Sequence, residues 1–314
     1  MTFSTGYSEL AAPNGGTFYT VTGNVRLAAN AGRLDDYFIH TSGQAFIYAG
    51  AGNDYIRSSA YDISYLFGQD GNDILIADDG RGKYLDGGVG NDILISSSRL
   101  SASNNNAVDT LVGGQGNDRF VVGEISADLV NNGFEDPWAA KAPQVRILLN
   151  DGDGHDVLTG STAGELDAPL WYFALPKKPI VTPVELTEAQ ANRLEVNVNA
   201  NNVTFNFRKL NNIDLALAPG DEGPSTIERF EVTLGYGTGI NSLRYVERLQ
   251  GDTSVDQINV GSGAFFTGQQ VRNIYQAFTS YQASNPSVAI DTISSVRNNS
   301  ELLQIIAQNS TSIA

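Results

Sequence analysis

The sequence contains no cysteine, and only two histidines occur among its 314 residues. The missing cysteines exclude disulfide bonds and thiolate metal sites. A zinc site is also not expected, because His40 and His155 are the only imidazoles that such a site could recruit.

Basic residues are scarce, since 19 Lys and Arg stand against 35 Asp and Glu, for a formal net charge of −16. Nucleic-acid-binding proteins rely on basic patches, so this balance argues against a nucleic-acid partner. It argues equally against binding to an anionic membrane surface. Folding gathers these carboxylates together, which costs free energy unless cations offset the charge. A merely solvated acidic surface is the alternative.

Long apolar runs are missing as well, so we expect no membrane span. No early apolar stretch follows a basic patch, as it would in a standard signal peptide. If the protein leaves the cell, we expect it to use another route. The sequence has no HExxH, no GxSxG and no cysteine nucleophile, and this favours a non-enzymatic function.

Glycine is abundant, with 33 residues, and many of them fall in a recurring nine-residue pattern. GGVGNDILI, at residues 87–95, fits G-G-x-G-x-D-x-U-x, in which U is a large apolar residue. Related segments occupy residues 49–57, 68–76, 113–121 and 151–159. Their sixth positions, separated by 19, 19, 26 and 38 residues, are Asp54, Asp73, Asp92, Asp118 and Asp156. Asp36 begins a weaker, earlier turn, DYFIH.

A step of about two nonapeptides predicts two strands per coil. Segments such as QAFIYAG and DTLVGG place apolar residues just before each glycine turn. Each coil would therefore contain a strand, a glycine-rich turn, a second strand and a looser turn. The long polar stretch SSSRLSASNNNAV accounts for the 26-residue gap as a surface insertion.

The glycine turns also predict a cation. Glycine tolerates positive φ, so successive carbonyls can point inward around one centre. Stacked strands lie about 4.8 Å apart, so aspartates at the same corner of adjacent coils would repel one another. A hard cation removes that repulsion, and Ca²⁺ accepts carbonyl and carboxylate oxygens in a more flexible geometry than Mg²⁺. The alternative is a metal-free β-solenoid whose aspartates only hydrogen-bond the turns.

This pattern resembles the repeats-in-toxin (RTX), or hemolysin-type calcium-binding, family. The resemblance implies a right-handed parallel β-roll over residues 33–160, with several Ca²⁺ ions held between successive turns. In that family each ion is bound by carbonyls of positions two and four of one turn, carbonyls of positions one and three of the next, and both aspartates.

Transferred to this sequence, the resemblance implies four sites. The first comprises Gly50, Gly52, Asp54, Gly68, Asp70 and Asp73. The second comprises Gln69, Gly71, Asp73, Gly87, Val89 and Asp92. The third comprises Gly88, Gly90, Asp92, Gly113, Gln115 and Asp118. The fourth is less expected because 38 residues intervene, and it comprises Gly114, Gly116, Asp118, Asp151, Asp153 and Asp156.

Three turns depart from the glycine consensus, at Ala49, Gln69 and Asp151. Gln69 is the departure that most threatens the turn at its site, because position two needs the freedom of glycine.

The second half of the chain reads differently. Residues 161–262 are expected to form a β-rich, degenerate solenoid, with an unrelated β-sandwich as the alternative. LEVNVNANNVTFNFRKL predicts two strands, as a hairpin or as a coil pair. Further along, Asp256 and Ile258 resemble the aspartate and apolar positions of a decayed repeat.

The C-terminal segment, residues 263–314, predicts helices. Val271, Ile274, Tyr275 and Phe278 follow helical spacing, and ELLQIIAQ offers a second amphipathic helix before a small, hydroxyl-rich tail. Such helices usually cap the open end of a solenoid. The arrangement also resembles the C-terminal export signals of type I secreted repeat proteins. Residues 1–32 are expected to cap the other end.

The sequence thus predicts an all-β parallel roll with a helical cap, and the resemblance implies secretion through a type I exporter and folding by extracellular calcium. Its expected role is non-enzymatic adhesion, surface or matrix structure, or binding of a polysaccharide or protein partner. The alternative is an enzyme that acts on uronate polysaccharides, such as a lyase or an epimerase, or its detached calcium-binding module.

Overall fold

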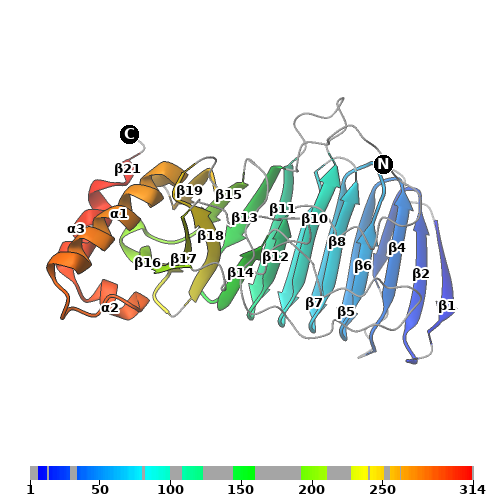
Figure 1. Ribbon diagram of the computed structural model, residues 1–314. Helices are drawn as coiled ribbons and strands as arrows, with labels where there is room; N and C mark the ends of the chain where they lie inside the picture. The colour runs from blue at the N-terminus through cyan, green and yellow to red at the C-terminus, as the bar shows by residue number, and fades with distance from the viewer. Residues whose placement is uncertain are drawn as a thin grey trace.

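The computed structural model of the chain describes residues 6–12, 14–28, 34–79, 82–99, 108–122, 144–159, 192–210, 228–239, 241–250, 255–261 and 263–312. Through the body of the roll, successive strands alternate between two sheets that face each other across one core (Figure 1). Most of the long polar insertion, residues 100–107, lies outside the described residues.

Among the described residues, sheet A contains eleven strands. In spatial order these are β1 (Tyr7–Ala11), β2 (Thr17–Thr22), β4 (Tyr37–Ser42), β6 (Tyr55–Ser58), β8 (Ile74–Asp79), β10 (Ile93–Arg99), β12 (Arg119–Val122), β14 (His155–Thr159), β18 (Asn241–Arg248), β17 (Arg229–Tyr236) and β16 (Thr204–Lys209).

Sheet B contains ten strands in the part of the chain that the structure describes. In spatial order these are β21 (Thr311–Ser312), β20 (Ala264–Thr267), β19 (Gln257–Val260), β15 (Asn192–Val196), β13 (Gln144–Leu149), β11 (Val108–Gln115), β9 (Tyr84–Val89), β7 (Ser64–Asp70), β5 (Ala45–Ala51) and β3 (Val25–Ala28).

Parallel pairing runs through the body of both sheets, from β2 to β18 in sheet A and from β3 to β19 in sheet B. Antiparallel pairs occur at the ends, where β1 joins β2, β16 and β17 follow β18, and β20 and β21 follow β19. The predicted all-β parallel roll with two strands per coil is confirmed.

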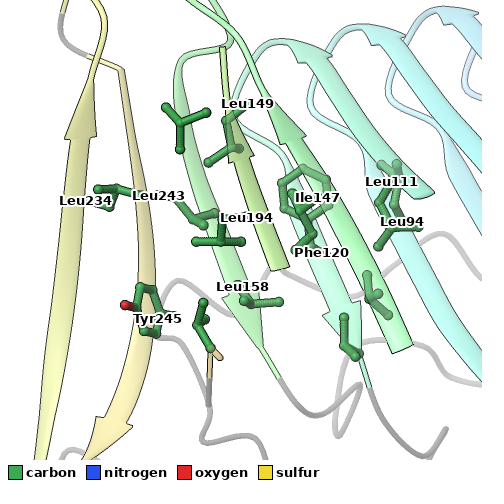
Figure 2. Packing of buried hydrophobic residues seen from close by; sticks show 14 of the residues in the cluster. Leu94, Leu111, Phe120, Ile147, Leu149, Leu158, Leu194, Leu234, Leu243 and Tyr245 are labelled. Carbon is green, nitrogen blue, oxygen red and sulfur yellow. The ribbon is translucent and has the colours of Figure 1, made fainter. Parts of the chain in front are cut away.

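The core is built from columns of registered apolar side chains. In sheet A one column contains Phe38, Ile56, Leu75, Leu94, Phe120 and Leu158. In sheet B the facing column contains Ile47, Leu66, Leu85, Leu111, Ile147, Leu194 and Ile258. All are almost fully buried, and Figure 2 shows Leu94, Leu111 and Phe120 among them. These two columns of large apolar residues thus fill the middle of the space between the sheets.

Beyond β14, the two segments predicted from LEVNVNANNVTFNFRKL separate. Strand β15 continues sheet B in parallel with β13, while β16 lies at the end of sheet A, after the short 3₁₀ helix η2 (Ala200–Asn202). They therefore do not form a hairpin, and β16 pairs antiparallel with β17 and not in parallel with β14 as a regular coil would. The interpretation of Asp256 as a repeat aspartate is wrong. It is exposed and precedes β19 of sheet B, whereas the repeat aspartates precede strands of sheet A.

Three helices cover the C-terminal end: α1 (Gly268–Ser284), α2 (Ile293–Arg297) and α3 (Ser300–Gln308) (Figure 1). The four apolar residues predicted for α1 are buried, and Leu302 and Ile306 of α3 join the same core. Helix α1 begins with a capping box between Thr267 and Gln270. The predicted helical cap is confirmed. Among the described helices, none has both the length and the apolar character that a membrane span requires.

Candidate calcium-binding turns

The repeat aspartates form a continuous ladder along one edge of the roll. Each backbone amide donates to the Oδ1 of the aspartate in the next coil, and the N···O distances lie between 2.7 and 2.9 Å. The ladder comprises Asp36, Asp54, Asp73, Asp92, Asp118 and Asp156, and it is called the aspartate ladder below. Sequence reasoning noted the turn at Asp36 but did not include it among the sites.

The second carboxylate oxygen distinguishes the central members. The Oδ2 atoms of Asp54, Asp73, Asp92 and Asp118 are buried and have no hydrogen-bond partner among the residues that the structure describes. A buried ionised oxygen without a partner is costly. Four such atoms at the same corner of consecutive coils are what a chain of bound cations would satisfy.

The pKa values of these carboxyls also show that their ionised form is unfavourable without a partner. Burial, opposed by the backbone hydrogen bond and reinforced by the neighbouring aspartates, raises the pKa of Asp54, Asp73 and Asp92 to about 7. Burial likewise raises the pKa of Asp118 to about 8. Without a cation the ladder therefore tends to hold protons at neutral pH, and a cation would compete with those protons.

Oxygens from successive turns converge above the first glycine of each motif. A Cβ atom at Gly87 would collide with Asp92 Oδ2 and would lie 2.7 Å from the carbonyl oxygen of Gly113. Asp92 and Gly113 both belong to the predicted third site. The same relationship holds at Gly68, where Asp73 Oδ2 and the Gly87 carbonyl approach, and these two belong to the predicted second site.

Other predicted carbonyls also come together between coils. The position-four amides of Gly52, Gly71, Gly90 and Gly116 donate to the position-three carbonyls of the next turn, and the N···O distances are 2.8 to 2.9 Å. The accepting carbonyls belong to Asp70, Val89, Gln115 and Asp153. Each carbonyl oxygen has a second lone pair that could serve an ion.

The second position of the motif needs a left-handed backbone. Gly50, Gly88, Gly114 and Gly152 all have φ between 97° and 114°. Gln69 adopts the same kind of conformation, with φ of 81°, and is the one non-glycine residue with positive φ in the described ranges. The turn that Gln69 was expected to threaten therefore keeps its shape, at the cost of local strain.

The fourth pair of turns stacks in spite of the 38 intervening residues, because β12 and β14 pair directly. Its chemistry differs, however. The phenol of Tyr236 donates to Asp156 Oδ2 at 3.2 Å, so this oxygen already has a protein partner. The side chain of Asp151 is exposed and accepts hydrogen bonds from Thr238 and Asn241. We therefore distinguish this pair from the three before it.

A second ladder runs beside the first on the exposed side of the turns. The amide of each position-five residue donates to the side-chain oxygen of the residue one coil earlier, at 2.7 to 3.0 Å. It comprises Asp35, Asn53, Asn72, Asn91, Asn117 and His155. Sequence reasoning missed it, although the recurring Asn-Asp pair carried the signal.

Side chains alone do not assemble a metal centre here. Within the ranges that the structure describes, no group of three or more His, Cys, Asp or Glu side chains converges. His40 is fully buried at the opposite edge, with Nδ1 3.0 Å from Ser58 Oγ. The oxygen donors that do converge are pairs of carboxylates and backbone carbonyls, which suit Ca²⁺.

Comparison with known proteins supports this chemistry. The family model described as RTX calcium-binding nonapeptide repeat (4 copies) matches residues 41–60, 63–82 and 104–124. These ranges contain the turns of Asp54, Asp73 and Asp118. Among curated proteins, no sequence matches the chain.

Proposed function

We propose, from the calcium-binding RTX repeats that this chain carries, that it is a secreted protein whose roll folds when Ca²⁺ binds outside the cell. Its role there would be non-enzymatic, as an adhesion, surface or matrix protein or as the binder of a partner. The run of four buried, unpartnered Oδ2 atoms in the aspartate ladder carries this proposal.

Three ions would occupy the spaces between the turns of Asp54 and Asp73, Asp73 and Asp92, and Asp92 and Asp118. Each internal aspartate would then serve two ions, so that binding at one site orders the turn needed by the next. At the low calcium concentration of the cytosol, carboxylate repulsion would disfavour the folded roll. At millimolar calcium, binding to the folded state alone would stabilise it.

The C-terminal cap would carry the type I export signal. Its helices pack on the end of the roll, so we expect the exporter to engage residues 263–314 while the chain is still unfolded. The low-calcium cytosol would keep it in that state, and folding would follow release.

The experiment that tests the proposal is far-UV circular dichroism during a calcium titration, with Mg²⁺ as control. We expect a cooperative gain of β-structure near millimolar Ca²⁺ and little change with Mg²⁺, which demands a stricter octahedral geometry. A spectrum that Ca²⁺ leaves unchanged, in a chain already folded in chelator, would refute the calcium switch.

A further inference from the structure

The outer face of sheet B carries a row of side chains that the repeat chemistry does not use. They are register neighbours on successive strands, and they alternate with the buried core residues. We call them the outer row: Arg26, Phe46, Tyr65, Tyr84, Thr110, Arg146, Arg193 and Gln257. Eight strands about 4.8 Å apart give it a length of about 34 Å.

The aromatic part of this face contains two pairs of stacked rings, while Tyr84 is tilted by 36° against Tyr65. Phe46 and Tyr65 stack at 4.5 Å between centroids with 4° between the ring planes. Beside them Tyr48 and Phe67 stack at 4.7 Å and 3°. Strand side chains stand roughly perpendicular to their sheet, so rings that face one another present their edges to solvent. Ring edges carry the positive end of the aromatic quadrupole and therefore favour anionic groups.

The charge of the outer row departs from that of the whole chain. It contains three arginines and no acidic residue, although the net charge of the protein is −16. Arg146 and Arg193 are register neighbours and exposed. The two acidic residues next to the row have partners: Asp86 accepts from the Tyr84 hydroxyl at 3.3 Å, and Glu195 lies 3.9 Å from Arg146.

The corresponding face of sheet A is different. Three of its outward-facing residues, Ile76, Ile95 and Val121, are almost fully buried and form a separate apolar cluster. Sheet B thus offers the more accessible of the two faces, because Arg26, Arg146 and Arg193 are exposed and the aromatic members are partly exposed.

We propose that the outer row binds an extended acidic polysaccharide. The guanidinium groups would pair with uronate carboxylates, which they match in geometry. The ring edges would favour the same anions, and the tyrosine hydroxyls would exchange hydrogen bonds with sugar hydroxyls. The length and the straight course of the row suit a polymer lying across the strands. This inference names the partner of the proposed extracellular protein and rests on that function.

The test measures binding of the full-length, calcium-saturated protein to hyaluronan, a uronate polymer, by affinity electrophoresis and calorimetry. Uncharged dextran and a single-stranded oligonucleotide serve as the other probes. We expect hyaluronan to bind, dextran not to bind, and the oligonucleotide to bind more weakly because of the protein's net charge.

The variants locate the binding. We expect Arg146→Gln to weaken hyaluronan binding about tenfold, the loss that follows from one hydrogen-bonded charge pair. Arg208→Gln is the matched control: its side chain is 51% exposed against 50% for Arg146, and it pairs with Glu231 of sheet A. Tyr65→Leu, which removes a ring edge, should also weaken binding.

Three results would overturn the inference: no binding of hyaluronan, equal loss in Arg146→Gln and Arg208→Gln, or tighter binding of the oligonucleotide. Circular dichroism of the same samples separates this inference from the proposed function. If the protein folds with Ca²⁺ but does not bind hyaluronan, only the assignment of the outer row as a glycan-binding site is contradicted. If Ca²⁺ does not change the folding of the protein, the proposed calcium-dependent folding is contradicted.

Discussion

The hydroxyl of Tyr236 donates a hydrogen bond to Oδ2 of Asp156, the last member of the aspartate ladder, at a distance of 3.2 Å. In the four preceding aspartates the same atom has no hydrogen-bond partner within the described part of the chain. The tyrosine thus gives Asp156 Oδ2 the hydrogen-bond partner that the Oδ2 atoms of the other coils lack. The series of oxygens that a cation would bind therefore ends before Asp156.

Tyr236→Phe should lower the free energy of unfolding in saturating Ca²⁺ by about 1–3 kcal/mol, because it leaves the buried Asp156 oxygen without a donor. Urea denaturation measures the change. Tyr7→Phe removes a hydroxyl from a residue that is 39% exposed and should have almost no effect. If both variants unfold alike, the Tyr236 hydrogen bond does not stabilise the end of the ladder.

Asp92→Asn should shift the midpoint of calcium-induced folding upward by about tenfold or more, because calcium affinity depends on the number of charged ligands. Asp92 belongs to two of the predicted sites, so its loss should affect both. Asp291→Asn makes the same charge change at an exposed residue before α2 and should leave the midpoint unchanged. Equal midpoints for the two variants would remove Asp92 from the calcium sites.

Gln69→Gly should stabilise the calcium-bound protein by about 1 kcal/mol, because glycine relieves the left-handed strain at φ of 81°. The matched control is Gln115→Gly at position three of a later turn, which does not have positive φ. There, the added freedom of the unfolded chain should lower stability by about 0.5–1 kcal/mol. Thermal unfolding of the two variants measures both changes in stability. A Gln69→Gly variant that is less stable than wild type would contradict the strain at this turn.

Acid should partly replace calcium. Burial raises the pKa of Asp54, Asp73 and Asp92 from 3.8 to about 7 and that of Asp118 to about 8. The folded, metal-free roll therefore binds more protons than the unfolded chain between 3.8 and those values. Its stability therefore falls as the pH rises through that window and is fully present only below it. Burial lowers the pKa of His40, which acts in the opposite direction, but one group opposes several.

Circular dichroism in chelator should show more β-structure at about pH 5 than at about pH 8. Saturating Ca²⁺ should remove most of that difference, because the ions displace the protons. A metal-free roll that gains structure toward alkaline pH would contradict the raised pKa values.

The roll was predictable from sequence because its signals are local and repeated. Each glycine turn, its aspartate and the following apolar strand lie within nine residues. The spacing alone is therefore enough to identify Asp54, Asp73 and Asp92 as repeat aspartates. The helical cap was predictable for the same reason, since the spacing of Val271, Ile274 and Phe278 is a property of one short segment.

What the sequence concealed depends on distant or unrepeated residues. Tyr236 reaches Asp156 across 80 residues, and a single tyrosine carries no periodic signal. Asp256 matched part of the motif, but a motif does not state which sheet its strand joins. The outer row is likewise invisible until the register places Arg146 beside Arg193.

The aspartate ladder also has a direction. Every amide donates toward the C-terminal end, Thr17 supplies the first donor to Asp36, and Tyr236 closes the last. Between Asp54 and Asp92 the contacts repeat every 19 residues without any change of kind. In evolution, therefore, the roll can gain or lose whole coils by duplication or deletion of such units while its two ends stay the same.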